Sequence, residues 1–149
     1  MEVLMFNERL KGSFDGMFRL EDARALGERL AQHGDWYAVQ PENLDQPHTP
    51  LTAQAARAHY LTLVEEILAA EKGVWSTMVY VQSQEEPRLI KIYHPKRAGC
   101  GCGGSGGILP WWIFSKEQPQ PVPQWQQAST KCEMSEHPKR GLIARLFSA

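Results

Sequence analysis

The sequence is poor in cysteine, nearly neutral, and without a long apolar run. Three cysteines among 149 residues are too few, and odd in number, for a disulfide-stapled scaffold. Sixteen Lys and Arg residues nearly balance seventeen Asp and Glu residues, so a net charge of −1 gives no electrostatic reason to expect nucleic-acid binding. No uncharged apolar stretch approaches the roughly 18 residues that a transmembrane helix requires.

The first twelve residues also lack the features of a secretory signal. They contain Glu2, Glu8, Arg9 and Lys11 around a short apolar run, with no basic start and no small-residue cleavage site. We therefore expect a cytoplasmic protein, in which the thiols stay reduced or bind a metal.

The composition is that of a folded domain, with 42% hydrophobic and 22% charged residues, which excludes a wholly disordered, collagen-like or coiled-coil chain. It changes after Ser115, where residues 118–124 read Gln-Pro-Gln-Pro-Val-Pro-Gln, a composition typical of extended chain. We predict a single α+β domain over residues 1–115 and an extended linker with a C-terminal tail over residues 116–149.

Two segments show the spacing of amphipathic helices. The first covers residues 21–33 and is followed by a capping glycine, Gly34. The second begins at Thr49-Pro50, a capping hydroxyl followed by proline, and runs to Lys72. Its predicted apolar stripe consists of Ala53, Ala56, Tyr60, Leu61, Val64, Ile67 and Leu68.

Alternating apolar residues predict a small antiparallel sheet against these two helices. The main hairpin pairs residues 74–82 with residues 88–93, in which Leu89 and Lys91 share one face. Shorter strands are predicted at residues 3–6, 36–39 and 111–114, with a turn at Asp15-Gly16.

The most unusual stretch is a glycine-rich segment with two cysteines. Six of the twelve glycines lie within residues 99–107, together with Cys100 and Cys102. One interpretation is a flexible loop with incidental cysteines. Another is a nest of backbone amides that binds an anion, although residues 101–106, which match G-x-G-x-x-G, are not followed by a helix start.

Two further interpretations use the thiols. Cys100, Cys102, Cys132 and either His94 or His137 can form a Cys₃His set for Zn or Cu(I), or hold an iron–sulfur cluster. A single residue separates the first two cysteines, whereas structural zinc sites typically have two to four. Alternatively, nearby Lys96 and Arg97 favour a reactive thiolate, although the sequence identifies no partner base.

The sequence contains no complete catalytic motif such as H-E-x-x-H or G-x-S-x-G. Trp111 and Trp112 are adjacent on a predicted strand, so we expect one to enter the core and the other to cover the glycine loop or line a cleft.

The tail is basic, because four Lys and Arg against two Glu give residues 131–149 a charge of +2. One helical face of the tail carries the apolar residues Leu142, Ile143, Leu146 and Phe147. Such a segment either docks on its own domain, frays, or binds a partner groove or, weakly, an anionic membrane surface.

The sequence thus predicts a non-enzymatic accessory or interaction protein whose partner is another protein. Its expected contact surfaces are Lys96 and Arg97 beside the glycine loop, the two tryptophans and the apolar face of the tail. The alternative is a protein that carries a metal, sulfur or redox equivalents on Cys100 and Cys102.

Overall fold

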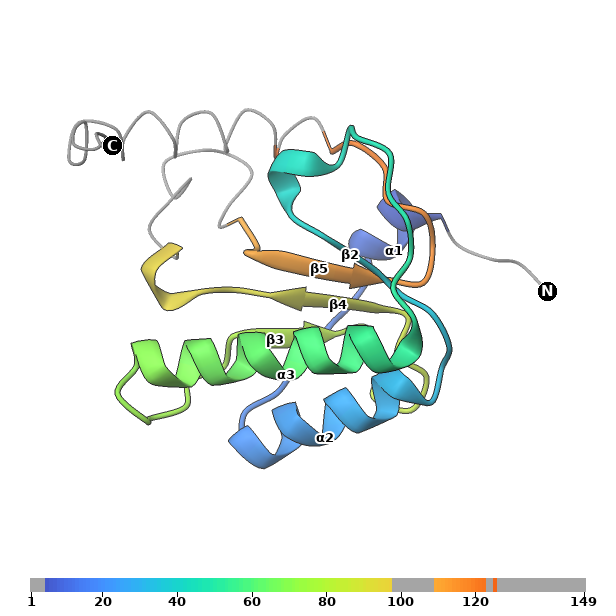
Figure 1. Ribbon diagram of the computed structural model, residues 1–149. Coiled ribbons are helices and arrows are strands. Elements are labelled where there is room, and N and C mark those ends of the chain that lie inside the picture. Colours follow the sequence, from blue (N-terminus) through green and yellow to red (C-terminus); the bar gives the residue numbers. More distant parts are fainter. Residues whose placement is uncertain (1–4, 98–108, 123–124, 126–149) are drawn as a thin grey trace, which may run out of the picture.

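The computed structural model describes residues 5–97, 109–122 and 125. These residues form a five-stranded antiparallel sheet in the order β1-β3-β4-β5-β2 (Figure 1). The strands are β1 (Asp15–Gly16), β2 (Tyr37–Val39), β3 (Val79–Val81), β4 (Leu89–Ile92) and β5 (Trp112–Ser115). The helices are α1 (Phe6–Leu10), α2 (Leu20–Ala31) and α3 (Ala53–Ala70), with short 3₁₀ turns η1 (Pro41–Asn43) and η2 (Pro95–Arg97). The predicted α+β fold, an antiparallel sheet packed by helices, is confirmed.

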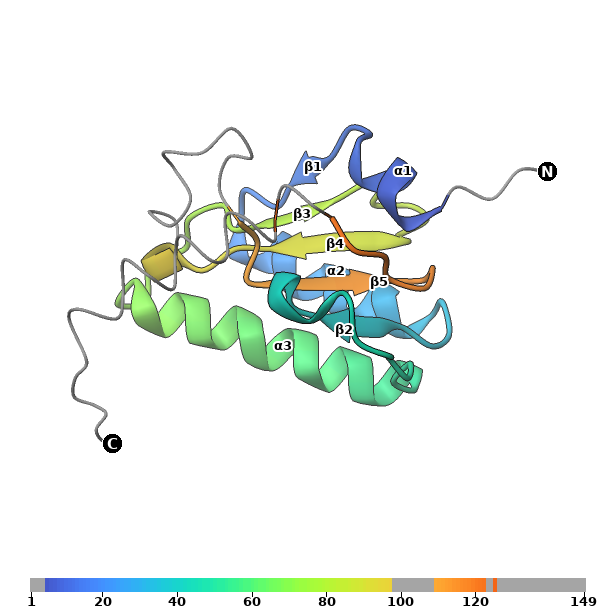
Figure 2. The ribbon, with the colours of Figure 1, turned by 90° about the horizontal axis from the view of Figure 1, so that it is seen from above.

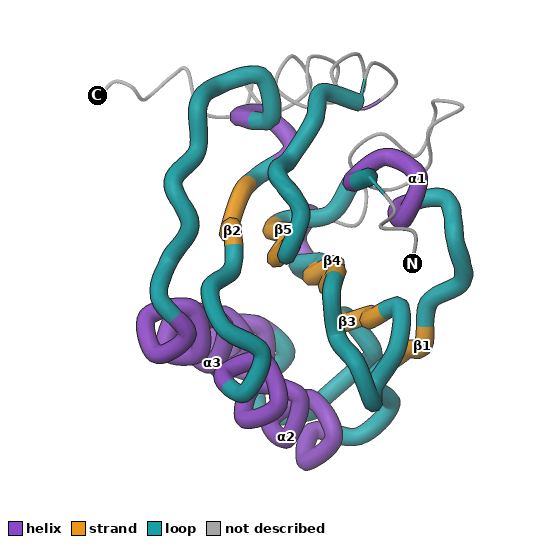
Figure 3. Tube along the Cα trace, turned by 90° about the vertical axis from the view of Figure 1, so that its right-hand side faces the viewer, coloured by secondary structure: helices purple, strands orange, loops and turns teal. Residues whose placement is uncertain are grey.

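Helices α2 and α3 form a layer on one face of the sheet (Figure 3). Apolar residues of β3, β4 and β5 pack against them, because alternate strand positions point to this face. The buried Tyr60 on α3 donates its hydroxyl to the carbonyl of Ala23 on α2, at 2.6 Å. The main core consists of residues Met17, Ala23, Leu26, Leu30, Trp36, Ala56, Tyr60, Leu63, Val64, Ile67, Val79, Val81, Ile90, Ile92 and Phe114.

The two helices approach each other closely at Gly27. A Cβ at this position would lie 3.0 Å from the ring of Tyr60 and 2.9 Å from a methyl of Leu61. Glycine here, in the middle of α2, costs some helix propensity but allows this contact.

The opposite face of the sheet is covered by α1 and by the chain after β5 (Figure 2). A second apolar cluster lies there, formed by Phe6, Val39, Leu44, Leu89, Ile113 and Val122. Val122 is 8% exposed and Pro119 is also buried. The described beginning of the stretch that we assigned to the linker, residues 116–122, therefore packs on the sheet. Its prolines suit this role, because a segment that lies on a sheet face without pairing needs no ladder of N–H donors.

Polar contacts also hold residues 116–122 in place. Glu117, 11% exposed, accepts a hydrogen bond from Nε of Arg9 on α1 at 3.1 Å and one from Nη2 of Arg88 at 3.0 Å. The ammonium of Lys116 donates to the carbonyls of His33 and, at 2.7 Å, of Asp35, just after α2. These contacts join the N-terminal helix, the start of β4 and the end of α2 through one short segment.

Several predicted boundaries were wrong for local reasons. The cap of α3 is Thr52, whose hydroxyl accepts from the N–H of Ala55 at 3.2 Å, so the helix starts after Thr49-Pro50. Asp15-Gly16 is a short edge strand paired with β3 instead of a turn. Phe6 opens a helix and does not end a strand, because Glu8 accepts from the N–H of Met5 as in a capping box.

Candidate functional site

The glycine–cysteine segment connects two neighbouring strands. β4 and β5 pair directly, with Ile92 opposite Trp112, so the chain between them leaves and re-enters the sheet at one end. Residues 98–108 lie outside the described part of the chain, and with them Cys100 and Cys102. Cys132 and the apolar tail residues Leu142, Ile143, Leu146 and Phe147 also lie outside it.

His94 and Trp111 flank the two ends of this connection. Their ring centroids are 4.6 Å apart, in an edge-to-face arrangement with an interplanar angle of 79°. The N–H of Trp111 donates to the carbonyl of Ile92 at 2.6 Å, which extends the β4–β5 ladder by one step. The two ends of the connection are therefore held together by a ring contact and a backbone hydrogen bond.

The role of His94 as a metal ligand stays a prediction, because Cys100, Cys102 and Cys132 lie outside the described residues. Its Nδ1 accepts a hydrogen bond from the N–H of Lys96 at 3.1 Å. In a neutral ring this hydrogen bond places the proton on Nε2. Among the described residues, no group of three or more His, Cys, Asp or Glu side chains is placed to hold a metal ion.

The two tryptophans do not divide between core and surface as predicted. Both are half-buried, and both pack against the main core. Trp111 lies just before β5 begins, so the strict alternation of a strand does not apply to it. Trp112 contacts the His59 ring of α3 edge-on, with the centroids 4.5 Å apart. Each indole thus has one side fixed by the core and part of its surface exposed.

His59 is a residue that the sequence did not single out for this site. It lies between Trp112 and Phe114, whose ring centroid is 5.5 Å from that of His59. Burial lowers the pKa of His59, and the charge of Glu66 opposes this only in part. The imidazole is therefore held neutral as a packing element beneath the indole.

The same end of the molecule also exposes large apolar side chains. The turn η2 contacts α3, and the chain that follows α3 begins at the same end of the molecule (Figure 1). Val74, in that chain, is 68% exposed, and Phe18, before α2, is 77% exposed. Trp75 joins these two segments, because its Nε1 donates to the carbonyl of Met17 at 2.9 Å. The sequence did not identify Phe18 and Val74 as surface residues, because hydropathy does not distinguish an exposed apolar residue from a buried one.

The predicted cations of this region are only partly described. Lys96 is exposed in η2, which also includes Arg97. The exposed Lys96 adds positive charge close to the His94–Trp111 pair, because η2 follows His94 directly.

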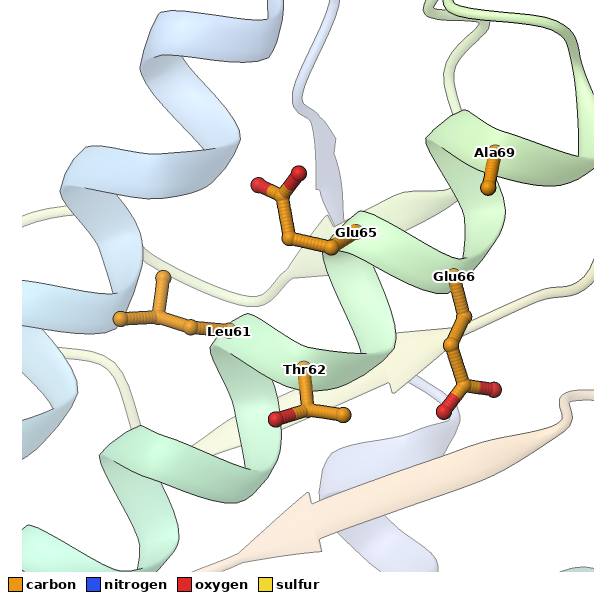
Figure 4. A pocket seen from close by; sticks show the side chains of 5 residues that line it. All are labelled: Leu61, Thr62, Glu65, Glu66 and Ala69. Carbon is orange, nitrogen blue, oxygen red and sulfur yellow. The ribbon is translucent and has the colours of Figure 1, made fainter.

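A shallow depression of about 420 Å³ lies on the outer side of α3, lined by Leu61, Thr62, Glu65, Glu66 and Ala69 (Figure 4). Glu65 accepts a hydrogen bond from Nη2 of Arg24 on α2 at 2.9 Å, so one of the two acidic residues that line the depression already has a partner. The described lining carries no nucleophile–base pair, and its open shape does not exclude water.

The described helices include none that is both long and apolar enough to cross a membrane. Comparison of the chain with protein-family models, with curated proteins and with solved structures found no match, so its function has to be inferred from the residues themselves.

Proposed function

We propose that the chain is an interaction protein that binds another protein through the end of the molecule that carries Trp111, Trp112, Val74 and Phe18. The observation that supports this most is the exposure of two large apolar side chains, Phe18 and Val74, on segments joined by the Trp75–Met17 hydrogen bond. Single exposed apolar residues are common, but two of them on segments joined by a half-buried indole are typical of contact surfaces.

The energetics favour a protein surface as the occupant. Burying an exposed side chain of the size of Val or Phe gains roughly 1.5–3 kcal/mol. The indoles are already fixed by the core, so binding them costs little additional side-chain entropy. Lys96 suits a partner with acidic residues around an apolar patch.

The basic tail is the second contact in this proposal. Residues 138–149 contain Lys139, Arg140 and Arg145 together with the apolar set Leu142, Ile143, Leu146 and Phe147. A short amphipathic segment of this kind adds a weak second attachment, which raises the overall affinity when both contacts form together.

The test is co-purification of partners from cells that naturally express the chain. We expect V74D and F18D to lose the partner captured by the wild type, and deletion of residues 138–149 to weaken its capture. The matched control is Q54D, a charge introduced on an exposed position of α3 away from this end. Equal capture by V74D, F18D and wild type, with unchanged melting temperatures, would contradict the proposal.

A further inference from the structure

The sheet face opposite α2 and α3 carries a lysine and two tyrosines next to one another. Tyr80 on β3 lies directly opposite Lys91 on β4. Tyr93 follows Lys91 by two residues and therefore points to the same face. The Tyr80 and Tyr93 rings meet edge-to-face with centroids 5.7 Å apart. None of the three belongs to the apolar cluster beneath α1 and residues 116–122, and all three are half-buried.

Lys91 has no acidic partner within the described residues. Its ammonium lies 4.1 Å from the centroid of the Phe14 ring, and no ion pair of the described residues includes it. An aromatic face compensates a partly desolvated ammonium less than a carboxylate does. Burial also lowers the pKa of Lys91, which reflects this incomplete compensation.

The tyrosines add hydroxyl donors to the ammonium. Within the described residues, neither hydroxyl forms a hydrogen bond. Burial, with a smaller effect of Tyr80, raises the pKa of Tyr93 to about 12, so its hydroxyl stays protonated near neutral pH. Directly opposed side chains have Cβ atoms about 4.5–5.5 Å apart, and alternate residues on a strand are about 7 Å apart. The three donor-bearing side chains are thus neighbours on one face of the sheet, together with the ring surfaces of the tyrosines and Phe14.

We propose that Lys91, Tyr80 and Tyr93 form a binding site for a small organic anion, in which an acidic group is attached to a flat apolar body. The ammonium and the two hydroxyls bind the acidic group, and the rings of Phe14 and the tyrosines contact the apolar body. The site is on a different face from the core that supports the tryptophans, and it does not depend on the proposed protein partner.

The charge requirement is tested with a matched pair of probes, 2-naphthoate and its neutral analogue 2-naphthamide, by isothermal titration calorimetry on the full chain. We expect one equivalent of naphthoate to bind and the amide to bind at least about tenfold more weakly, as expected when a charged hydrogen bond is lost. Inorganic phosphate and benzoate, each titrated as a competitor, distinguish acidic groups that bind without an apolar body from those that need one.

Variants connect the binding to these residues. We expect K91M to lose at least about tenfold in naphthoate affinity, while K91R retains most of it, because Arg keeps the positive charge. Y93F should weaken binding by a smaller factor, and K72M, which removes an exposed lysine after α3, should have no effect. If K91M does not fold, Y80F and Y93F decide the outcome. Equal affinities for naphthoate and naphthamide, or undiminished binding by K91M or by a folded Y80F/Y93F double variant, would overturn the proposal.

Discussion

Replacement of Glu117 by alanine tests whether the segment after β5 is part of the folded domain. The carboxylate joins α1 to the start of β4, because Arg9 donates to Oε1 at 3.1 Å and Arg88 donates to Oε2 at 3.2 Å and 3.0 Å. Glu117 and Arg9 are 11% and 13% exposed, whereas Arg88 is 43% exposed and more strongly screened by solvent.

The expected cost follows from this difference in burial. A hydrogen bond to a charged group contributes roughly 1.5–3 kcal/mol, and removal of one partner leaves Arg9 partly buried without compensation. The exposed Arg88 contributes little to this free energy. We therefore expect E117A to lower the free energy of unfolding by about 2–3 kcal/mol. With a urea m-value of roughly 1–3 kcal/mol/M, the midpoint should fall by about 0.7–3 M.

The matched control is the exposed ion pair between Glu28 and Arg57. Its shortest N–O distance is 2.7 Å, shorter than any in the Glu117 network, and Arg57 contacts both carboxylate oxygens. The side chain of Glu28 is nevertheless 57% exposed, so E28A should change stability little. Urea unfolding followed by tryptophan fluorescence measures both variants. Equal losses for E28A and E117A, or no loss for E117A, would refute the reasoning from burial.

Two further predictions follow from the described contacts, and a third from the cysteines of the sequence. G27A should destabilise the fold by about 1–3 kcal/mol in urea unfolding, despite the better helix propensity of alanine, because its Cβ meets the buried Tyr60 ring. Since the pKa of His59 is lowered in the folded state, the stability it contributes is full above pH of about 6.5 and falls as pH decreases through the folded pKa. The variant H59Q should therefore show a smaller loss between pH 7.5 and 5.5. For the alternative of a metal carrier, elemental analysis of protein purified under reducing conditions should find near-stoichiometric metal that C100S loses, and a metal-free wild type with unchanged melting on addition of Zn²⁺ or Cu(I) would exclude it.

The helices and the central hairpin could be predicted because their signals are local. The 3.6-residue period located α2 and α3, and alternation placed Leu89 and Lys91 on one face of β4, as the structure has them. The short edge strand at Asp15–Gly16 could not be predicted, since its two residues resemble a turn and its strand conformation depends on pairing with β3.

The site was harder to predict than the fold, for a physical reason. The exposure of Phe18 and Val74 depends on where α2 begins and α3 ends in space, not on their own residue types. The burial of Glu117 and Val122 likewise depends on α1, more than 100 residues away in the sequence. The expected boundary after residue 115 was based on composition, which records the prolines but not the surface on which they lie.

The strand order has a consequence for the synthesis of the chain. Both edge strands, β1 and β2, come from the first 39 residues, whereas the three strands between them end at Ser115. The partner of β2 is β5, so 76 residues separate Val39 from Ser115, and at roughly 5–20 residues per second translation of this interval takes about 4–15 s. During these seconds the nascent N-terminal part contains β2 without its partner strand, whereas β1 can pair with β3 once Val81 has been made. The shortness of β1 and β2 is then an advantage, because long unpaired apolar strands are prone to aggregate before their partner strands are synthesised.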